Sequence, residues 1–116
     1  MKIADIISAL GLEIMVDKNL DREIKGCYVS DMLSDVLANG HEGNLWITRQ
    51  THPNIVAVAA IKGLAGIVIT GGKQVEPDTI IKAEAEEVPL MLTPLSSFET
   101  AGICYSLGKK AQGDLE

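Results

Sequence analysis

The clearest indication of the fold comes from residues 63–93, GLAGIVITGGKQVEPDTIIKAEAEEVPLMLT. Residues 66–70 form a nearly continuous apolar run, which is typical of a strand covered on both faces. A helical pattern opens at Pro77, whose fixed φ suits a first helical turn, and a second apolar run follows at residues 90–92. A strand, a helix and another strand in this order predict a crossover unit of a parallel sheet.

The same unit recurs along the chain from Cys27 onward. Short strands are expected at residues 27–29, 45–48, 66–70 and 90–92. A helical pattern follows each strand. Ser30 or Asp31 can cap the first of these helices, and Pro53 suits the start of the second. Ser96 and Glu99 have the spacing of a capping box and predict the start of the last helix.

The N-terminal residues add one more helix and one more strand. Apolar residues recur there at the spacing of one helix face, at Ile3, Ile6, Ile7 and Leu10. This spacing predicts a helix over residues 2–10, with Gly11 as its stop. Residues 12–16 then alternate between apolar and polar, which favours a strand.

Together these elements predict a single α/β domain with a mainly parallel sheet, alternating helices and three layers. The domain is expected to span residues 1–108, and residues 109–116 are expected to form a loose polar tail. In the helix that opens at Pro77, Ile81 and Ala85 are expected to face inward.

Composition and charge argue against several classes of protein. Of 116 residues, 47% are hydrophobic and only 3% are aromatic, which favours the aliphatic core of an α/β domain. The formal net charge of −6 argues against nucleic-acid binding, because that needs clustered Lys and Arg. The longest apolar region, residues 55–69, contains Lys62 and is too short for a membrane span, and the N-terminus does not resemble a signal peptide. We therefore expect a cytoplasmic protein without a nucleic-acid or membrane partner.

The two cysteines, Cys27 and Cys104, predict neither a disulfide framework nor a metal site. They lie far apart with no repeated spacing, so both are expected to be buried free thiols. Together with His41 and His52 they could make a zinc set on paper, but zinc ligands normally come in close pairs and none of these residues has a close partner. We expect no bound metal and no cofactor.

Polar loops follow the predicted strands, and these loops are expected to meet at one edge of the sheet. In an open parallel sheet, ligands bind at the edge shared by the carboxyl ends of the strands and the N-termini of the helices. Unpaired helix N–H groups favour an anion there, and two cations in these loops add to the effect. The predicted ligand is a phosphate or carboxylate compound, with adenine nucleotides among the candidates. The candidate ligand-binding residues are Arg49, Thr51, His52, Asn54, Thr70, Gly71, Gly72 and Lys73.

The specific motifs for phosphate binding are absent from these loops. A Walker loop would need glycine at Ile67 and a hydroxyl residue at Gln74, and the dinucleotide pattern G-x-G-x-x-G is absent too. Gly71 and Gly72 therefore have two open interpretations, a tight turn or a ligand contact, because both use the missing Cβ. The charged loop residues are likewise either solvated or ligand-bound. No set of residues predicts a catalytic site.

Four segments carry a family resemblance: GCYVSDMLSDVLANG (26–40), LWITRQTHPNIVAVAA (45–60), GIVITGG (66–72) and SSFETAG (96–102). Together they resemble the DRTGG domain, a small bacterial and archaeal module, with similarity from about Asp21 to Gly108. Thr70, Gly71 and Gly72 supply the TGG of the name, whereas Thr51-His52 stands where Asp-Arg is expected.

The resemblance implies an α/β domain similar to the N-terminal domain of HPr kinase/phosphorylase. Such domains occur beside phosphotransacetylase domains, or beside CBS modules in regulated pyrophosphatases, and the resemblance implies a regulatory, dimer-forming role. It does not imply kinase activity, because the phosphate-binding loop of HPr kinase belongs to a separate catalytic domain.

Three functional hypotheses remain. The leading one is a non-catalytic regulatory module that forms a homodimer and binds a small anionic metabolite at the edge formed by residues 49–54 and 70–73. An alternative is a protein-interaction subunit of a larger partner enzyme, with Trp46 and the apolar helices as contact surface. A third is an enzyme with His52 as acid or base beside Thr51 or Asp31, which we disfavour because nothing in the sequence orients the histidine.

Overall fold

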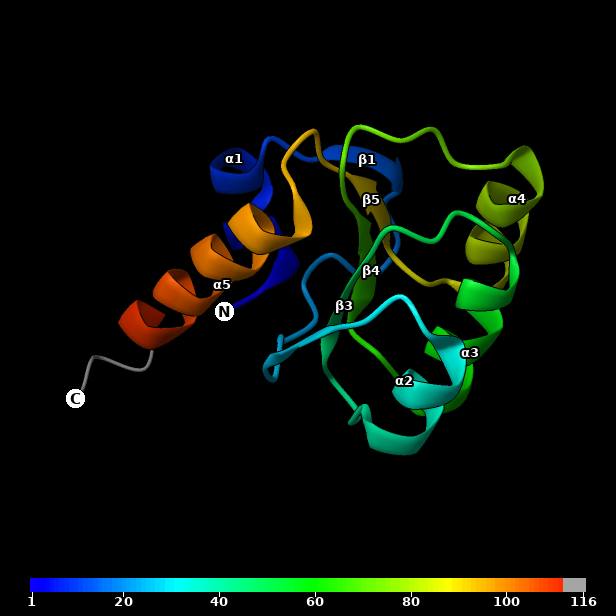
Figure 1. Cartoon of the computed structure of the whole chain (residues 1–116), viewed down its shortest axis with the longest axis horizontal. Coiled ribbons are helices and arrows are strands. Elements are labelled where there is room, and N and C mark those ends of the chain that lie inside the picture. The colour runs from blue at the N-terminus through cyan, green and yellow to red at the C-terminus, as the bar shows by residue number, and fades with distance from the viewer. Residues whose placement is uncertain (112–116) are drawn as a thin grey trace.

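A five-stranded sheet forms the middle layer of the structure, a computed structural model that describes residues 1–111 (Figure 1). The strands are β1 (Glu13–Val16), β2 (Cys27–Val29), β3 (Leu45–Thr48), β4 (Gly66–Ile69) and β5 (Leu90–Leu92). Their order across the sheet is β1-β5-β4-β3-β2. Strands β2 to β5 run parallel, and β1 pairs antiparallel with β5. The mainly parallel sheet is confirmed, and the carboxyl ends of β2 to β5 share one edge.

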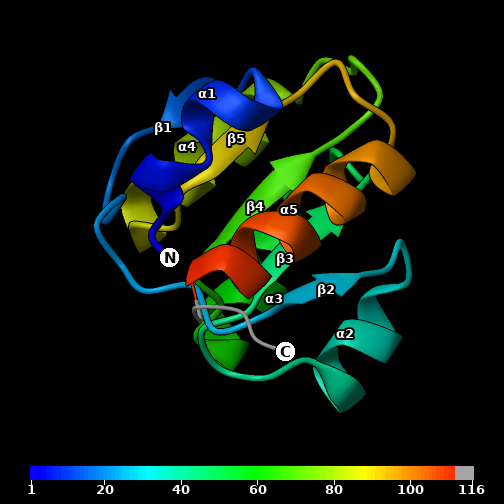
Figure 2. The same ribbon diagram turned by 90° about the vertical axis from the view of Figure 1, so that its left-hand side faces the viewer.

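Helices cover both faces of the sheet. One layer contains α2 (Leu33–Asn39), α3 (Asn54–Lys62) and α4 (Pro77–Glu86). The other contains the 3-10 helix η1 (Ile3–Asp5), α1 (Ile7–Leu10) and α5 (Ser97–Ala111). Figures 1 and 2 show the two helical layers on opposite sides of the strands. The predicted three-layer α/β architecture is therefore confirmed.

Two aliphatic clusters join these layers to the sheet. In β3, Trp46 packs in the cluster under α2 to α4, whereas Leu45 and Ile47 pack in the cluster under α1 and α5. Successive strand residues point to opposite faces, so each strand contributes to both clusters. Every residue of β3 and β4 is buried, which explains their continuous apolar runs. Burial of each large aliphatic side chain stabilises the fold by about 1.5–3 kcal/mol.

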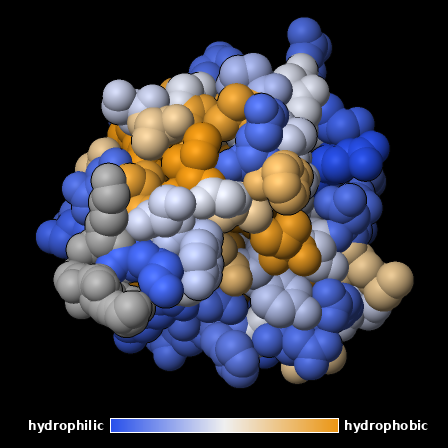
Figure 3. Space-filling model, turned by 60° about the vertical axis from the view of Figure 1, so that its left-hand side comes forward, coloured by the Kyte–Doolittle hydropathy of each residue, from blue (hydrophilic) through white to orange (hydrophobic). Residues whose placement is uncertain are grey.

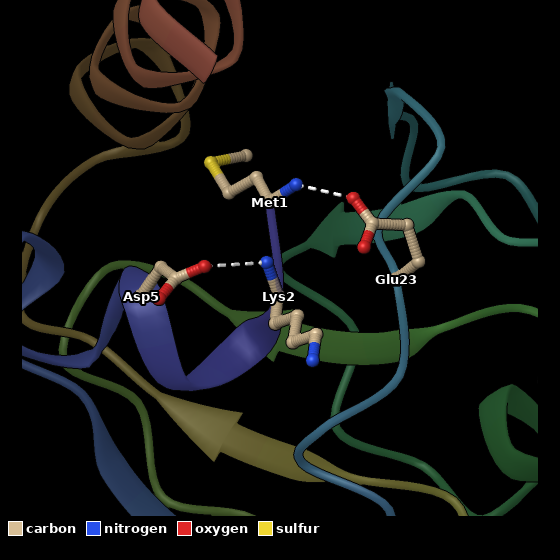
Figure 4. Close-up of polar contacts among 4 residues, drawn as sticks. All are labelled: Met1, Lys2, Asp5 and Glu23. Atoms are coloured by element: carbon tan, nitrogen blue, oxygen red, sulfur yellow. Dashed lines mark hydrogen bonds and ion pairs between the residues drawn. The ribbon is translucent and has the colours of Figure 1, made fainter.

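The N-terminal segment differs from the single helix predicted there. The carbonyl of Met1 accepts a hydrogen bond from the Ile24 N–H at 2.7 Å, and the terminal ammonium forms an ion pair with Glu23 (Figure 4). The Lys2 N–H donates to the Asp5 carboxylate at 2.8 Å. Because the first residues are extended and bonded to a distant segment, the helix divides into η1 and α1. The apolar spacing still predicts the buried face of this segment, since Ile3, Ile6 and Leu10 are buried.

Helix α4 presents a different face to the core from the one predicted. Ile81 is 67% exposed and Ala85 is exposed, whereas Thr79 and Ala83 are buried. The Thr79 hydroxyl donates to the carbonyl of Thr51 at 2.7 Å, which ties the first turn of α4 to the loop after β3. Residues i and i+4 share a helix face, so this bond places Ala83 inward and leaves Ile81 outside.

The last helix, α5, extends through Ala111 and so passes the domain boundary predicted at residue 108. The division into a domain of residues 1–108 and a tail of residues 109–116 stays a prediction, because residues 112–116 lie outside the described part of the chain. Among residues 1–111, none of the helices combines the length and the apolar character that a membrane crossing requires.

Candidate functional site

Four loops meet at the edge where the parallel strands end. They follow β2, β3, β4 and β5 at residues 30–32, 49–53, 70–76 and 93–96. The candidate ligand-binding residues all lie in the second and third of these loops, apart from Asn54, the first residue of α3. Because β3 and β4 are adjacent strands, the structure brings the two loops to the same part of the edge.

Asp31 joins the first two loops instead of capping α2. Its carboxylate accepts hydrogen bonds from the Thr48 hydroxyl at 3.1 Å and from the Arg49 N–H at 2.8 Å. The Gln50 side-chain amide donates to the Asp31 carbonyl at 2.8 Å. The cap predicted for Ser30 or Asp31 is therefore wrong, because Met32 is the N-cap of α2 without a side-chain cap bond, and the Asp31 carboxylate reaches across to the neighbouring strand. The Ser30 hydroxyl accepts the Met32 N–H at 3.1 Å, just before α2 begins.

Gly71 and Gly72 turn a corner that is held by the backbone. Both have positive φ, at 84° and 69°, where a side chain is strained. The Gly71 N–H donates to the Leu95 carbonyl at 2.7 Å, and the Gly72 N–H donates to the Thr93 carbonyl at 3.0 Å. Both amides are thus used within the protein and are not directed at a ligand. Any ligand contact by these glycines falls to their exposed Cα atoms and carbonyls.

Thr70 lies inside the edge and not on its surface. The residue is fully buried, and its hydroxyl shares a hydrogen bond of 2.7 Å with the Ser97 hydroxyl at the start of α5. The same hydroxyl lies 3.4 Å from the Thr48 carbonyl. Thr70 therefore connects β4 to β3 and α5, which makes it a positioning residue among the candidates.

The surface of the edge is formed by the remaining candidates. Arg49, His52, Asn54 and Lys73 are exposed, and Thr51 is half-buried. In the described residues the ion pair between Met1 and Glu23 is the only one, so neither Arg49 nor Lys73 is paired with a carboxylate there. Two unpaired cations on adjacent loops can attract an anion from solvent.

The N-terminus of α5 is closed by the predicted capping box. The Ser96 hydroxyl accepts the Glu99 N–H at 3.1 Å, and the Glu99 carboxylate accepts the Ser96 N–H at 3.0 Å. These hydrogen bonds, the backbone one foremost, lower the pKa of Glu99. The cap is therefore formed above the usual pKa range of Glu and weakens as the pH falls through the lowered pKa. A ligand at this edge cannot use these two amides.

The Asp35 carboxylate of α2 is held by two hydrogen bonds beside β2. Asp35 accepts hydrogen bonds from the Asn39 amide at 2.8 Å and from the Tyr28 hydroxyl at 2.9 Å. The Asn39 bond is the main cause of the lowered pKa of Asp35, and the bond to Asp35 raises the pKa of Tyr28. The bond between Tyr28 and Asp35 holds α2 against the edge strand β2.

No catalytic arrangement is formed by the described residues of this edge. The His52 ring nitrogen Nδ1 contacts the side-chain oxygen of Asn54, and no carboxylate orients the ring. Neither Thr51 nor Asp31 is a hydrogen-bond partner of this histidine in the described part of the chain. Residues 1–111 also contain no group of three or more His, Cys, Asp or Glu side chains that could hold a metal ion.

A hollow of about 690 Å³ lies elsewhere, between β2 and α5. We call it the α5 groove; its lining includes Ile24, Cys27, Val29, Phe98, Cys104 and Tyr105. Apolar side chains are exposed along it, since Phe98 is 88% exposed and Tyr105 is 67% exposed. Figure 3 shows hydrophobic surface gathered on this side of the molecule, the side on which α5 lies.

The α5 groove was not predicted from the sequence, although the sequence contains one signal for it. Phe98 and Tyr105 are separated by two helical turns, so they share a stripe of α5 that differs from the stripe facing the core. Trp46, which was predicted to contribute a contact surface, is fully buried under the other helical layer. The exposed aromatic surface therefore comes from α5.

These features define a small three-layer α/β domain. It has a polar loop edge at the carboxyl ends of its parallel strands and an apolar groove between β2 and α5. The family model of the DRTGG domain matches residues 5–107. The chain therefore belongs to the DRTGG domain family, and the resemblance carried by its four segments is confirmed.

A solved structure shares this fold: the CBS and DRTGG domains of the regulatory region of Clostridium perfringens pyrophosphatase, complexed with the activator diadenosine tetraphosphate. The TM-score is 0.66 at 21% sequence identity, and the match covers 87% of this chain and 44% of that one. The chain thus spans less than half the length of that regulatory region. No curated protein matches the chain.

Proposed function

We propose that this chain is a non-catalytic regulatory module that binds a small anionic metabolite at the loop edge, with adenine nucleotides as the first candidates. The observation that carries the proposal is the pair of exposed cations, Arg49 and Lys73, on adjacent loops with no carboxylate partner in the described residues. Family membership supports it, because the solved relative is part of a regulatory region complexed with a nucleotide activator.

Hydrogen bonds beneath the edge preorganise its loops. Asp31 ties the loop after β2 to the loop after β3, and Thr70 ties β4 to the start of α5. Thr79 adds a bond between α4 and the loop after β3. A ligand that meets loops already held in place loses less binding free energy to ordering them. The edge is therefore suited to reversible recognition of a small molecule.

Two helix N-termini add to the attraction for an anion. Neither Pro53, the N-cap of α3, nor Glu76, the N-cap of α4, forms a side-chain cap hydrogen bond. Several first-turn amides are used locally, since those of Ile55 and Thr79 donate to the carbonyls of His52 and Glu76. The aligned peptide dipoles of each helix still place partial positive charge at its start, which stabilises an exposed anion by about 0.3–1 kcal/mol per helix. Because the Gly71 and Gly72 amides are used internally, recognition rests on these helix starts and on side chains. We expect binding that weakens as salt concentration rises.

Calorimetric titration with ATP, AMP, acetyl phosphate and inorganic phosphate tests this site. For the anion that binds, Arg49→Ala and Lys73→Ala should each weaken affinity about tenfold, because a charge-assisted hydrogen bond contributes about 1.5–3 kcal/mol. Lys18→Ala is the matched control: it also removes one cation, but Lys18 follows β1, whose end lies at the opposite edge of the sheet. Its affinity should equal that of the unmodified chain.

Absence of heat with all of these compounds would remove the ligand-binding proposal. Equal weakening in all three variants would show that net charge, and not this edge, controls binding. Either result would leave the alternative of a protein-interaction subunit, for which the α5 groove is the candidate surface.

The second candidate role is self-association, which the α5 groove favours. Two aromatic side chains, Phe98 and Tyr105, are exposed at this groove, and contiguous exposed apolar surface commonly marks an interaction site. We propose that the chain forms a homodimer through this face, so that light scattering gives twice the mass of 12.4 kDa.

Phe98→Asp should then give a monomer, since it places a charge in the apolar contact. Ile61→Asp alters another largely exposed apolar residue, 74% exposed, on α3 in the opposite layer and should leave the dimer intact. A monomer without any substitution would contradict this role.

A further inference from the structure

Both cysteines are free thiols, but only one of them is buried as the sequence predicted. Cys104 is buried in the cluster under α5, but Cys27 is exposed. The difference has a physical cause: β2 is the last strand of the sheet, so no further strand covers it, and the α5 groove opens beside it. An edge strand therefore leaves one thiol accessible to solvent.

Strand register places the two sulfurs on the same side of the sheet. Cys27 pairs in register with Leu45 of β3, and Leu45 packs in the cluster that also contains Cys104. Neighbouring residues in register on parallel strands point to the same face. Cys27 thus points toward α5, which packs against β2, and both cysteines line the α5 groove.

The two thiols differ in exposure and in pKa. The neighbouring Cys104 side chain lowers the pKa of Cys27. The Cys27 side chain, together with burial, raises the pKa of Cys104. The thiolate is the nucleophile in thiol chemistry, and access to solvent decides which thiol meets a reagent. Cys27 is accordingly the attacking thiol, and Cys104 is the thiol placed to resolve its product.

We propose that Cys27 and Cys104 form a reversible dithiol–disulfide site, oxidised by a low-molecular-weight disulfide, that joins edge strand β2 to α5 across the groove. This site is separate from the loop edge, since α5 and β2 meet along the groove while the candidate anion-binding residues lie in the loops after β3 and β4. It does not depend on the proposed ligand, and it is reached in the monomer, because the homodimer proposed through the α5 groove would cover Cys27.

The reaction is two successive thiol–disulfide exchanges. The Cys27 thiolate attacks one sulfur of the small disulfide, which breaks its S–S bond and releases one small thiolate. The product is a mixed disulfide on Cys27. Cys104 then loses its proton and attacks the Cys27 sulfur, forming the protein disulfide and releasing the second small thiolate. In total the two protein thiols lose two electrons and two protons, and the small disulfide becomes two thiols.

The closed disulfide changes what the groove can do. It fixes an edge strand to the helix that carries Phe98 and Tyr105, so the apolar lining loses freedom to adapt to a partner. A small thiol at sufficient concentration reverses the reaction by the same two exchanges. The groove thus has a reduced and an oxidised form.

Mass spectrometry after treatment with oxidised glutathione tests the site. The reduced chain is incubated with oxidised glutathione at low protein concentration, quenched with acid, and blocked with N-ethylmaleimide. We expect the intact mass to fall by two hydrogen atoms, with neither a glutathione adduct nor a maleimide adduct, and peptide mapping to link Cys27 to Cys104. Dithiothreitol should restore both thiols.

Single substitutions separate the two roles. Cys104→Ala should retain one glutathione on Cys27, because no resolving thiol remains. Cys27→Ser should react at least tenfold more slowly than the unmodified chain, because Cys104 is buried. Circular dichroism confirms that each variant is folded before it is used.

The proposal would be overturned if the unmodified chain kept the Cys27–glutathione adduct as long as Cys104→Ala does. A disulfide that joins two chains in place of one would also overturn it. Both outcomes would mean that the sulfurs, although neighbours in the groove, cannot reach bonding geometry within one chain.

Discussion

Trp46→Ala should lower the free energy of unfolding by about 3–5 kcal/mol, the usual cost of deleting a fully buried Trp or Phe side chain. Trp46 has no exposed surface and lies in the centre of the cluster between β3 and the layer of α2 to α4. A domain of this size is stable by only about 5–15 kcal/mol, so much of the chain should be unfolded at moderate urea. Urea titration followed by circular dichroism at 222 nm measures the change, since the variant has no tryptophan.

Trp46→Phe and Ile61→Ala serve as controls for this experiment. The indole N–H donates to the Ser30 carbonyl at 2.8 Å, and phenylalanine keeps much of the ring volume but removes that bond. A smaller loss is expected for Trp46→Phe than for Trp46→Ala. Ile61 is 74% exposed, so Ile61→Ala should change stability little. A Trp46→Ala variant as stable as Ile61→Ala would contradict the described core.

The double substitution Gly71→Ala/Gly72→Ala should lower the free energy of unfolding by about 2–4 kcal/mol, because a left-handed backbone costs a non-glycine residue about 1–2 kcal/mol. The cost is conformational and not steric. A Cβ added at Gly71 would meet nothing within 4 Å, and one added at Gly72 would meet only the Pro94 Cα at 3.9 Å. Urea titration monitored by Trp46 fluorescence measures the change.

Gly102→Ala is the matched control, with the opposite sign expected. Gly102 lies inside α5, and a Cβ there also meets nothing within 4 Å. Alanine in a helix interior is favoured over glycine by about 0.5–1 kcal/mol, so this variant should gain stability. If the double variant had the same free energy of unfolding as the unmodified chain, positive φ at Gly71 and Gly72 would not be required for this corner.

The sheet was predictable from the sequence because its strands are short apolar runs separated by helical patterns. Residues 45–48 and 90–92 agree with β3 and β5 to the residue, and the capping box of Ser96 and Glu99 forms as expected. Each of these signals depends on residues close together in the chain. Local periodicity and capping are decided by backbone geometry over a few residues, so a sequence displays them directly.

The side chains that differ from their predicted positions do so because of segments far away in the chain. Ile81 faces outward because the Thr79 hydroxyl bonds to the loop after β3. Asp31 does not cap α2 because its carboxylate accepts the Arg49 N–H. Cys27 is exposed because β2 is an edge strand, and strand order is not visible in local patterning. In each case a tertiary hydrogen bond or the position of a strand outweighs local preference.

The candidate site was predicted in part for the same reason. The sequence placed polar loops after parallel strands, so it located the edge and the cations Arg49 and Lys73 at its surface. It could not decide whether Gly71 and Gly72 present their amides to a ligand. That depended on Thr93 and Leu95, whose carbonyls accept those amides in the folded chain.

The amino-acid sequence alone was enough to identify the α/β class, the layers, the family and the general position of the polar edge, because periodicity, turn residues and motifs are local properties. The folded chain was needed to establish which polar groups remain free at that edge, that Thr70 is internal, and that Cys27 and Cys104 line the same groove. Hydrogen bonding and burial are settled between segments far apart in the chain, once strand order has brought them together.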